Sequence, residues 1–281
     1  MAVVITLIAG LDAESALSGV ALTLGGQVDW LAPTACDIVG ADERAVRAAI
    51  GERPIDLLVQ PAAGRKKRLL VADFESTIIE NEMLEELADF LGMRAHVAEI
   101  TRRAMNGEID FLAALSERVA LLRSLPASVL DEAASRIRLM PGAAALIATL
   151  RRAGVYTALV SGGFTVFAEP VARSLGFDRV VANRLDVADG KLTGTLMPPI
   201  VGGATKRETL LSLAAELGLG IEETMAVGDG ANDLPMLREA GFGVAFHAKP
   251  AVAAASRWRI DHADLTALLY AQGYREEELI R

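Results

Sequence analysis

Three stretches of the sequence share one pattern, an apolar run that ends in small and acidic residues. They are RLLVADF from residue 68, YTALVSGG from residue 156 and ETMAVGDGAND from residue 223, and FGVAFHA from residue 242 is a weaker copy. Continuous apolar runs of this kind are typical of strands buried on both faces of a parallel sheet. Segments with helical spacing lie between them, at 143–153, 165–175 and 205–217. Strands that alternate with helices predict an α/β fold with a doubly wound parallel sheet.

The interval 82–140 lacks this alternation and is helical in pattern almost throughout. A helical insertion directly after the first strand predicts a cap over the strand ends, where sheets of this type bind their ligands. The segment ANRLDVADGKLTGTL at 182–196 alternates around Asp189-Gly190, which predicts a β-hairpin.

The first sixty residues have a different organisation. Strand patterns at 3–9, 27–31, 35–39 and 55–60 and helix patterns at 13–23 and 42–50 give the order βαββαβ. We therefore expect a small α+β domain at 1–62, a basic linker at 63–68 and a second domain at 69–281. The linker contains GRKKR at 64–68, which we interpret as a solvated charge run.

The amino-acid composition indicates which partners and which cellular compartment we expect. The formal net charge is -9, which argues against nucleic acid or an acidic membrane surface, because binding to phosphates relies on clustered Lys and Arg. Cys36 is the single cysteine, so no internal disulfide forms, and its apolar neighbours predict a buried thiol. No apolar run approaches the ~20 residues that span a bilayer. We expect a soluble, cytoplasmic protein with no membrane partner.

The ends of the predicted strands carry the chemistry. Carboxylates gathered at one edge repel one another unless a cation lies among them, and oxygen ligands at a wet strand end suit Mg²⁺. A carboxylate can also be a nucleophile that accepts a phosphoryl group, whose oxygens need cations and hydrogen-bond donors. Singly, an acid can be a helix cap, SGG a turn and a lysine a solvated charge. Their order along one chain favours a phosphoryl-transfer site of Asp73, Glu75, Ser161, Gly162, Gly163, Lys206, Asp229, Asn232 and Asp233.

With these motifs, DFEST, SGG, a helix-opening lysine and GDGAND, the chain resembles the haloacid dehalogenase superfamily of phosphohydrolases. Within it, the chain resembles the phosphoserine phosphatases over about residues 68–270. The resemblance extends beyond the core motifs to ENEMLEELA, ITRRAMNGEIDFLAALSERVALL, VSGGF and AVGDGANDLPML. It implies Mg²⁺-dependent hydrolysis of O-phospho-L-serine through an aspartyl-phosphate, as the last step of serine biosynthesis.

The resemblance also implies residue roles. Asp73 would be the nucleophile, and Glu75 would act as acid and base while its backbone carbonyl binds Mg²⁺ beside Asp73 and Asp229. Asp233 would occupy the outer shell of the metal. The remaining roles concern substrate: Ser161, Gly162, Gly163, Lys206 and Asn232 for phosphate, Glu82 for ammonium, Arg118 for carboxylate, and Met105 and Phe111 for the cap wall.

Glu75 departs from the family pattern, which has Asp at this position. A carboxylate misplaced by about 1 Å can cost ~100-fold in rate, although the ordinary pKa values of Glu and Asp are close. Three explanations are open: an adjusted site, a slow or altered enzyme, or a phospho-aspartate that persists long enough for transfer. We favour the adjusted site.

Two further hypotheses follow from this departure. One is a phosphotransferase that passes the phosphoryl group from phosphoserine to another hydroxyl, such as that of homoserine. The other is a catalytically impaired amino-acid sensor, which the retained Asp73, Lys206 and Asp229 argue against. The element order of residues 1–62 resembles the ACT domains. We interpret this unit as a homodimerisation module, with a regulatory amino-acid site as the alternative.

Overall fold

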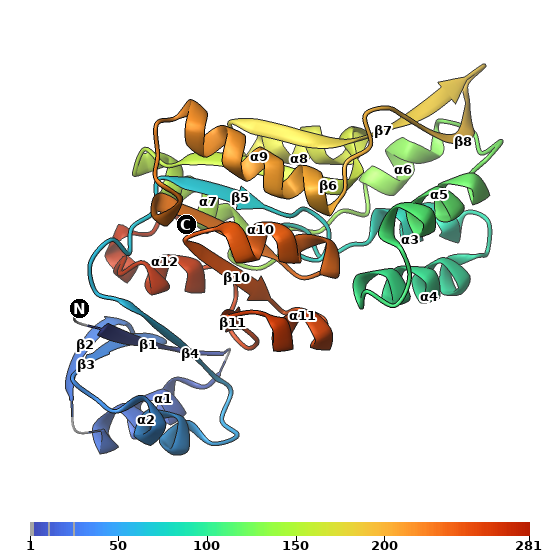
Figure 1. Cartoon of the computed structure of the whole chain (residues 1–281). Coiled ribbons are helices and arrows are strands. Elements are labelled where there is room, and N and C mark those ends of the chain that lie inside the picture. Colours follow the sequence, from blue (N-terminus) through green and yellow to red (C-terminus); the bar gives the residue numbers. More distant parts are fainter. Residues whose placement is uncertain (1–2, 11, 25) are drawn as a thin grey trace.

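The computed structural model describes residues 3–10, 12–24 and 26–281, apart from the side chain of Met105. It contains two separate sheets (Figure 1). The smaller sheet has four antiparallel strands in the order β2-β3-β1-β4. Its strands are β1 (Val3–Ala9), β2 (Gln27–Ala32), β3 (Ala35–Val39) and β4 (Ile55–Pro61), and its helices are α1 (Glu14–Thr23) and α2 (Glu43–Ile50). We call these six elements the small unit.

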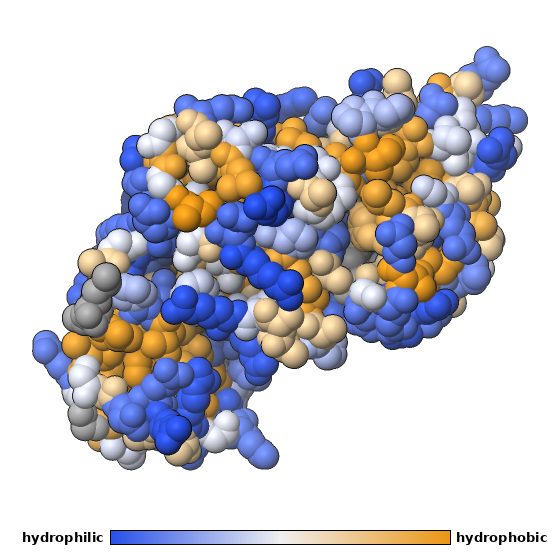
Figure 2. Space-filling model, viewed as in Figure 1, coloured by the Kyte–Doolittle hydropathy of each residue, from blue (hydrophilic) through white to orange (hydrophobic). Residues whose placement is uncertain are grey.

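Alternation of side chains along β1 determines how the small unit packs. Ile5 and Leu7 point to the core formed with α1 and α2, whereas Ile8 belongs to the core of the larger sheet. Cys36 is buried in the small core, as predicted. Apolar residues also remain on the surface over these strands (Figure 2), among them Val3, Trp30 and Val39.

The larger sheet has seven strands in the order β11-β10-β9-β5-β6-β7-β8. All neighbours are parallel except the hairpin β7–β8. The strands are β5 (Leu69–Ala72), β6 (Tyr156–Phe164), β7 (Arg179–Ala188), β8 (Lys191–Met197), β9 (Thr224–Gly228), β10 (Phe242–Phe246) and β11 (Trp258–Ile260). The central strand β5 is fully buried because helices cover both faces. The predicted doubly wound α/β sheet is confirmed.

The two faces have separate cores. Leu70 and Ala72 pack on one side with α7 (Ala143–Arg152), α8 (Thr165–Leu175) and α12 (Ala267–Ala271). Leu69 and Val71 pack on the other side with α9 (Gly203–Glu216), α10 (Leu234–Glu239) and α11 (Pro250–Ala255). Among the described residues, no helix has the length and apolar character needed to cross a membrane.

The predicted helical cap is present. It consists of α3 (Met83–Asp89), α4 (Arg94–Met105), α5 (Phe111–Leu121) and α6 (Val129–Ala134), beyond the carboxyl end of β5 (Figure 1). The chain enters and leaves it through an antiparallel bridge between Ile79 and Leu139. The predicted hairpin also forms, and its turn has positive φ at Asp189 (51°) and Gly190 (71°), as a tight primed turn requires. Gly190 O accepts a hydrogen bond from Ala127 N of the cap region.

The prediction of a solvated linker at 64–68 is wrong for two of its four cations. Arg65 donates to both oxygens of Asp37, to Thr6 and to the carbonyl of Ala271. Lys67 is 8% exposed and donates to the carbonyls of Gly64 and Glu222. The basic run therefore joins the two sheets, because a buried cation needs acceptors that only the folded chain brings to it.

Candidate active site

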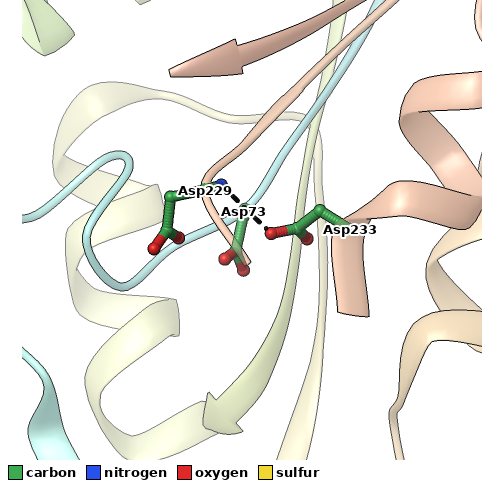
Figure 3. Close-up of side chains that lie close together, drawn as sticks. All are labelled: Asp73, Asp229 and Asp233. Carbon is green, nitrogen blue, oxygen red and sulfur yellow. Dashed lines mark hydrogen bonds between the residues drawn. The ribbon is translucent and has the colours of Figure 1, made fainter. Parts of the chain in front are cut away.

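The carboxyl ends of β5 and β9 bring three aspartates together. Asp73 follows β5, Asp229 follows β9, and Asp233 lies in the short 3₁₀ turn Ala231–Asp233 (Figure 3). One carboxylate oxygen of each lies within 4.8 Å of the other two. Lys206 on α9 is completely buried, and its Nζ lies 2.5 Å from Asp73 Oδ1 and 2.5 Å from Asp233 Oδ1. The structure thus brings together the aspartates that the sequence pattern places at the strand ends.

Burial and mutual repulsion control the charges of this cluster. Burial raises the pKa of Asp73 well above its ordinary value, and the Asp233 charge adds to the shift against the opposing Lys206. Burial also raises the pKa of Asp229 to about 7. Burial alone would lower the pKa of Lys206, but Asp233 and Asp73 hold it above its ordinary value. Ionising all three buried carboxylates together is therefore costly unless a further cation joins the lysines beside them.

The donor set fits a hard divalent cation. Asp229 Oδ2 is buried without a hydrogen-bond partner among the described residues, although Lys249 Nζ lies 3.3 Å away. Asp233 differs, because its Oδ1 binds Lys206 and its Oδ2 accepts from the backbone N–H groups of Asp229 and Gly230. Asp73 and Asp229 thus have oxygens to offer a metal directly, whereas Asp233 suits a place in the outer shell.

Glu75 lines the same pocket as Asp73 and Asp229. Its Oε1 accepts a hydrogen bond of 3.0 Å from Met83 N at the start of the cap. The carboxylate rests against the backbone of Gly163, where a Cβ atom would come within 2.9 Å of both its oxygens. Burial and then the Glu82 charge raise the pKa of Glu75 to about 8. The longer side chain is therefore accommodated, and its protonated form is favoured at neutral pH.

The cap supplies a cation and an anion. Arg118 on α5 is 3% exposed and donates to Ala114 O and to Thr101 Oγ1. Glu82, just before α3, accepts a 2.7 Å hydrogen bond from Ser76 Oγ. Neither forms an ion pair with another described residue. Two opposite charges held by hydroxyl groups in one pocket are suited to a ligand that carries both an ammonium and a carboxylate.

The pocket itself is small and closed by the cap. Its described wall consists of Asp73, Glu75, Glu82, Leu84, Phe111, Leu115, Arg118, Ser161, Gly162, Asp229 and Asn232. Phe111 packs on Gly162, where a Cβ would meet its ring at 2.7 Å. Asn232 Oδ1 is buried and has no hydrogen-bond partner among the described residues.

Three predicted residues lie apart from the described pocket wall. Lys206 contacts both Asp73 and Asp233, but neither Lys206 nor Asp233 lines the pocket. Gly163 donates its N–H to Ser161 Oγ at 2.8 Å and contacts Glu75. The side chain of Met105 lies outside the described part of the structure.

Sequence reasoning missed several residues of the site. Lys249 follows β10 and reaches Asp229, so the strand-end rule that found the acids could have found this lysine as well. Leu84 and Leu115 of the pocket wall and Thr101 beside Arg118 gave no comparable signal. In the sequence they do not differ from other helix residues, and only the folded cap brings them to the site.

Comparison with known proteins shows the family of this chain. The model of the haloacid dehalogenase-like hydrolases matches residues 70–238. "Phosphoserine phosphatase SerB2" of Mycobacterium tuberculosis is 43% identical over 249 residues, which are 88% of this chain and 60% of that protein. "Phosphoserine phosphatase" of Lactococcus lactis is 47% identical over 203 residues, which are 72% of this chain and 94% of that protein.

A solved structure extends the comparison. It is described as a "Phospho-Aspartyl Intermediate Analogue of Phosphoserine phosphatase", with a TM-score of 0.70 and 40% identity over 73% of this chain and 98% of that one. The chain belongs to the haloacid dehalogenase-like hydrolases, within the phosphoserine phosphatase family. It spans 60% of the length of the mycobacterial relative.

Proposed function

We propose that the chain hydrolyses O-phospho-L-serine to L-serine and phosphate. The observation that carries the proposal is the pocket of opposite charges. Lys206 and Asp73 lie at the sheet end, and Arg118 and Glu82, neither of which forms an ion pair with another described residue, lie on the cap side. Phosphoserine presents a phosphate, an ammonium and a carboxylate. Glu82 would face its ammonium, Arg118 its carboxylate, and Lys206 together with a bound metal its phosphate. The names of the relatives agree with this substrate.

The chemistry has two halves. In the first, an Asp73 carboxylate oxygen attacks phosphorus, the bond from phosphorus to the serine oxygen breaks, and Glu75 gives its proton to that oxygen. In the second, Glu75 takes a proton from water, whose oxygen attacks phosphorus and releases phosphate and the Asp73 carboxylate. The raised pKa of Glu75, about 8, supports its starting as the acid.

The other site residues hold and orient the phosphate. We assign this role to Lys206, Ser161, Asn232 and the backbone N–H group of Gly162, whereas the Gly163 N–H donates to Ser161 Oγ and so orients that hydroxyl. Phe111 and Met105 would form the apolar cap wall. Mg²⁺ would be held by Asp73, Asp229 and the backbone carbonyl of Glu75, with Asp233 in the outer shell. When bound, Mg²⁺ supplies positive charge against the phosphate oxygens.

The proposal includes the setting of the protein. We assign it to the cytoplasm and to the last step of serine biosynthesis, and we assign residues 1–62 and 69–281 to two domains joined by 63–68. The ACT-like small unit would form a homodimer. Sedimentation equilibrium of the full chain tests that assembly, and a monomer at all concentrations would refute it.

The test of function is phosphate release from L-phosphoserine with Mg²⁺, run beside Glu75→Asp and with homoserine as an added acceptor. We expect release selective for phosphoserine over other small monoesters. Acid quenching should trap a phosphoenzyme in the parent protein and none in Asp73→Asn. Release only after Glu75→Asp, or phosphohomoserine as the main product, would replace hydrolysis with an impaired or transferring enzyme.

A further inference from the structure

Arg118 is a buried cation that has no carboxylate partner in the described part of the chain. Its side chain is almost fully covered, and among the described residues it forms no ion pair. Two neutral acceptors hold it instead, Ala114 O at 3.0 Å from Nε and Thr101 Oγ1 at 2.7 Å from Nη1. Taking a charge out of water is costly, so these acceptors determine where the guanidinium lies.

Thr101 is fixed in the orientation that accepts this bond. It lies on α4, a different helix from Arg118, and is 4% exposed. Its hydroxyl donates its own proton to Val97 O at 2.9 Å, one turn earlier in α4. With the proton committed there, the oxygen lone pairs are free to accept from Arg118. The contact is therefore an oriented bond between two cap helices.

A carboxylate of the same pocket competes for this guanidinium. Glu82 lines the pocket with Arg118, and its charge attracts Arg118 more strongly than that of any other carboxylate. If Arg118 paired with Glu82, one ion pair would use both groups that a zwitterionic ligand needs.

We propose that Thr101 is a positioning residue, which holds Arg118 on the cap side and so keeps Arg118 and Glu82 available for the substrate. The inference rests on the proposed function, because it assigns Arg118 to the carboxylate of phosphoserine. Thr101 acts through Arg118 and is not itself a catalytic residue.

The test is Thr101→Val, which keeps the shape of the side chain and removes the acceptor. A hydrogen bond to a charged group contributes enough that KM for phosphoserine should rise about tenfold. Because the bond serves binding in both ground and transition states, kcat should fall by less than about threefold. O-Phosphoethanolamine lacks the carboxylate, so its KM, or its inhibition constant against phosphoserine, should change by less than about twofold on the same reasoning.

Two further variants separate positioning from packing. Thr101→Ser retains the hydroxyl and should restore KM. Ser116→Ala is the matched control, since Ser116 Oγ donates to Leu112 O one turn earlier in a cap helix but lies on the exposed face. We expect its KM to remain that of the parent protein. A KM rise as large in Thr101→Ser as in Thr101→Val would show that keeping the hydroxyl does not preserve binding, and the inference would be wrong.

Arg118→Met distinguishes this inference from the proposed function. If Arg118→Met raises KM for phosphoserine and Thr101→Val does not, the positioning role fails and the substrate assignment survives. If neither variant changes KM for phosphoserine, Arg118 does not bind the carboxylate and the substrate assignment itself fails.

Discussion

At position 75 the side chain is one methylene longer than the aspartate of the family pattern, and its carboxylate occupies space beside the backbone of residue 163. Only glycine leaves that space free, since a Cβ there would lie 2.9 Å from both carboxylate oxygens. Met83 N then fixes the carboxylate from the cap side at 3.0 Å. The local packing shows where the longer side chain of Glu75 fits, and the adjusted site stays a prediction for kinetics to test.

This packing predicts that Gly163→Ala acts through Glu75. The added methyl would push the carboxylate from its position, and a shift of about 1 Å can lower kcat by ~10- to 100-fold. Glu75→Asp withdraws the carboxylate by one methylene and leaves room for the methyl. We therefore expect the double variant to be faster than Gly163→Ala alone, with a favourable coupling in a double-mutant cycle of kcat.

Gly19→Ala is the control for this cycle, because nothing lies within 4 Å of a Cβ at Gly19 on α1. It should leave kcat unchanged. If the effects of Gly163→Ala and Glu75→Asp were simply additive, the two residues would not share the space, and Glu75 would need another explanation.

At the scale of elements, the junction of cap and sheet is a two-stranded hinge. Glu80 N donates to Arg138 O and Met140 N donates to Ile78 O, each at 2.9 Å. Asn81, 8% exposed, adds a side-chain connection across the hinge. Its Oδ1 accepts from Arg138 N at 2.8 Å and its Nδ2 donates to Arg136 O at 3.2 Å. These four bonds hold the two chain segments together where the cap begins and ends.

Asn81→Ala should loosen the hinge. It leaves the Arg138 N–H and the Arg136 carbonyl, both partly buried, without their partner, which costs about 1–3 kcal/mol of unfolding free energy for each group that water does not reach. Urea unfolding measures the loss. Hydrogen exchange should show faster exchange at the Glu80 and Met140 amides in particular.

Arg138→Ala is the matched control at this hinge. It removes the Arg138–Glu80 ion pair, whose side chains are 74% and 38% exposed, and such pairs contribute ~0–1 kcal/mol. Equal losses in the two variants would mean that the Asn81 bonds do not hold the hinge.

The elements also show how far sequence reasoning reached. The long apolar runs predicted β5, β6 and β9 and located the acids after β5 and β9, because a strand buried on both faces has a strong local signal. The three-residue strand β11 (Trp258–Ile260) was missed, since so short a segment has no periodicity. Arg65 was wrongly assigned to solvent because its partner Asp37 is 28 residues away and no local sequence pattern indicates this contact. The same applies to Thr101, whose partner lies on another helix.

At the scale of the whole molecule, buried polar bonds join the small unit to the larger sheet. Asp56 on β4 is 4% exposed and accepts from the backbone N–H groups of Asp261, His262 and Ala263, which follow β11. Gln60 donates to Ala271 O, and Trp258 Nε1 donates to Val59 O. Apolar contacts of Ile8 and Leu58 with the larger core lie beside them. The two sheets are thus expected to unfold together.

Asp56→Ala should uncouple them. It leaves three N–H groups without their acceptor at a buried junction, at about 1–3 kcal/mol each for the groups that water does not reach. The two tryptophans, Trp30 in β2 and Trp258 in β11, report on the small unit and the junction. In the parent protein, urea unfolding followed by fluorescence and by far-UV circular dichroism should coincide. In Asp56→Ala the fluorescence transition should come at lower urea.

Arg275→Ala is the control, because the Arg275 side chain bridges the same junction at the surface. Its pair with Asp29 has side chains that are 42% and 52% exposed, so we expect a loss of ~0–1 kcal/mol and coincident transitions. Asp56→Asn keeps one side-chain oxygen and should fall between the two. If Asp56→Ala also unfolded in one coincident transition with the stability of Arg275→Ala, the polar bonds would be dispensable, and apolar contact such as that of Ile8 and Leu58 would suffice to make the two sheets one cooperative unit.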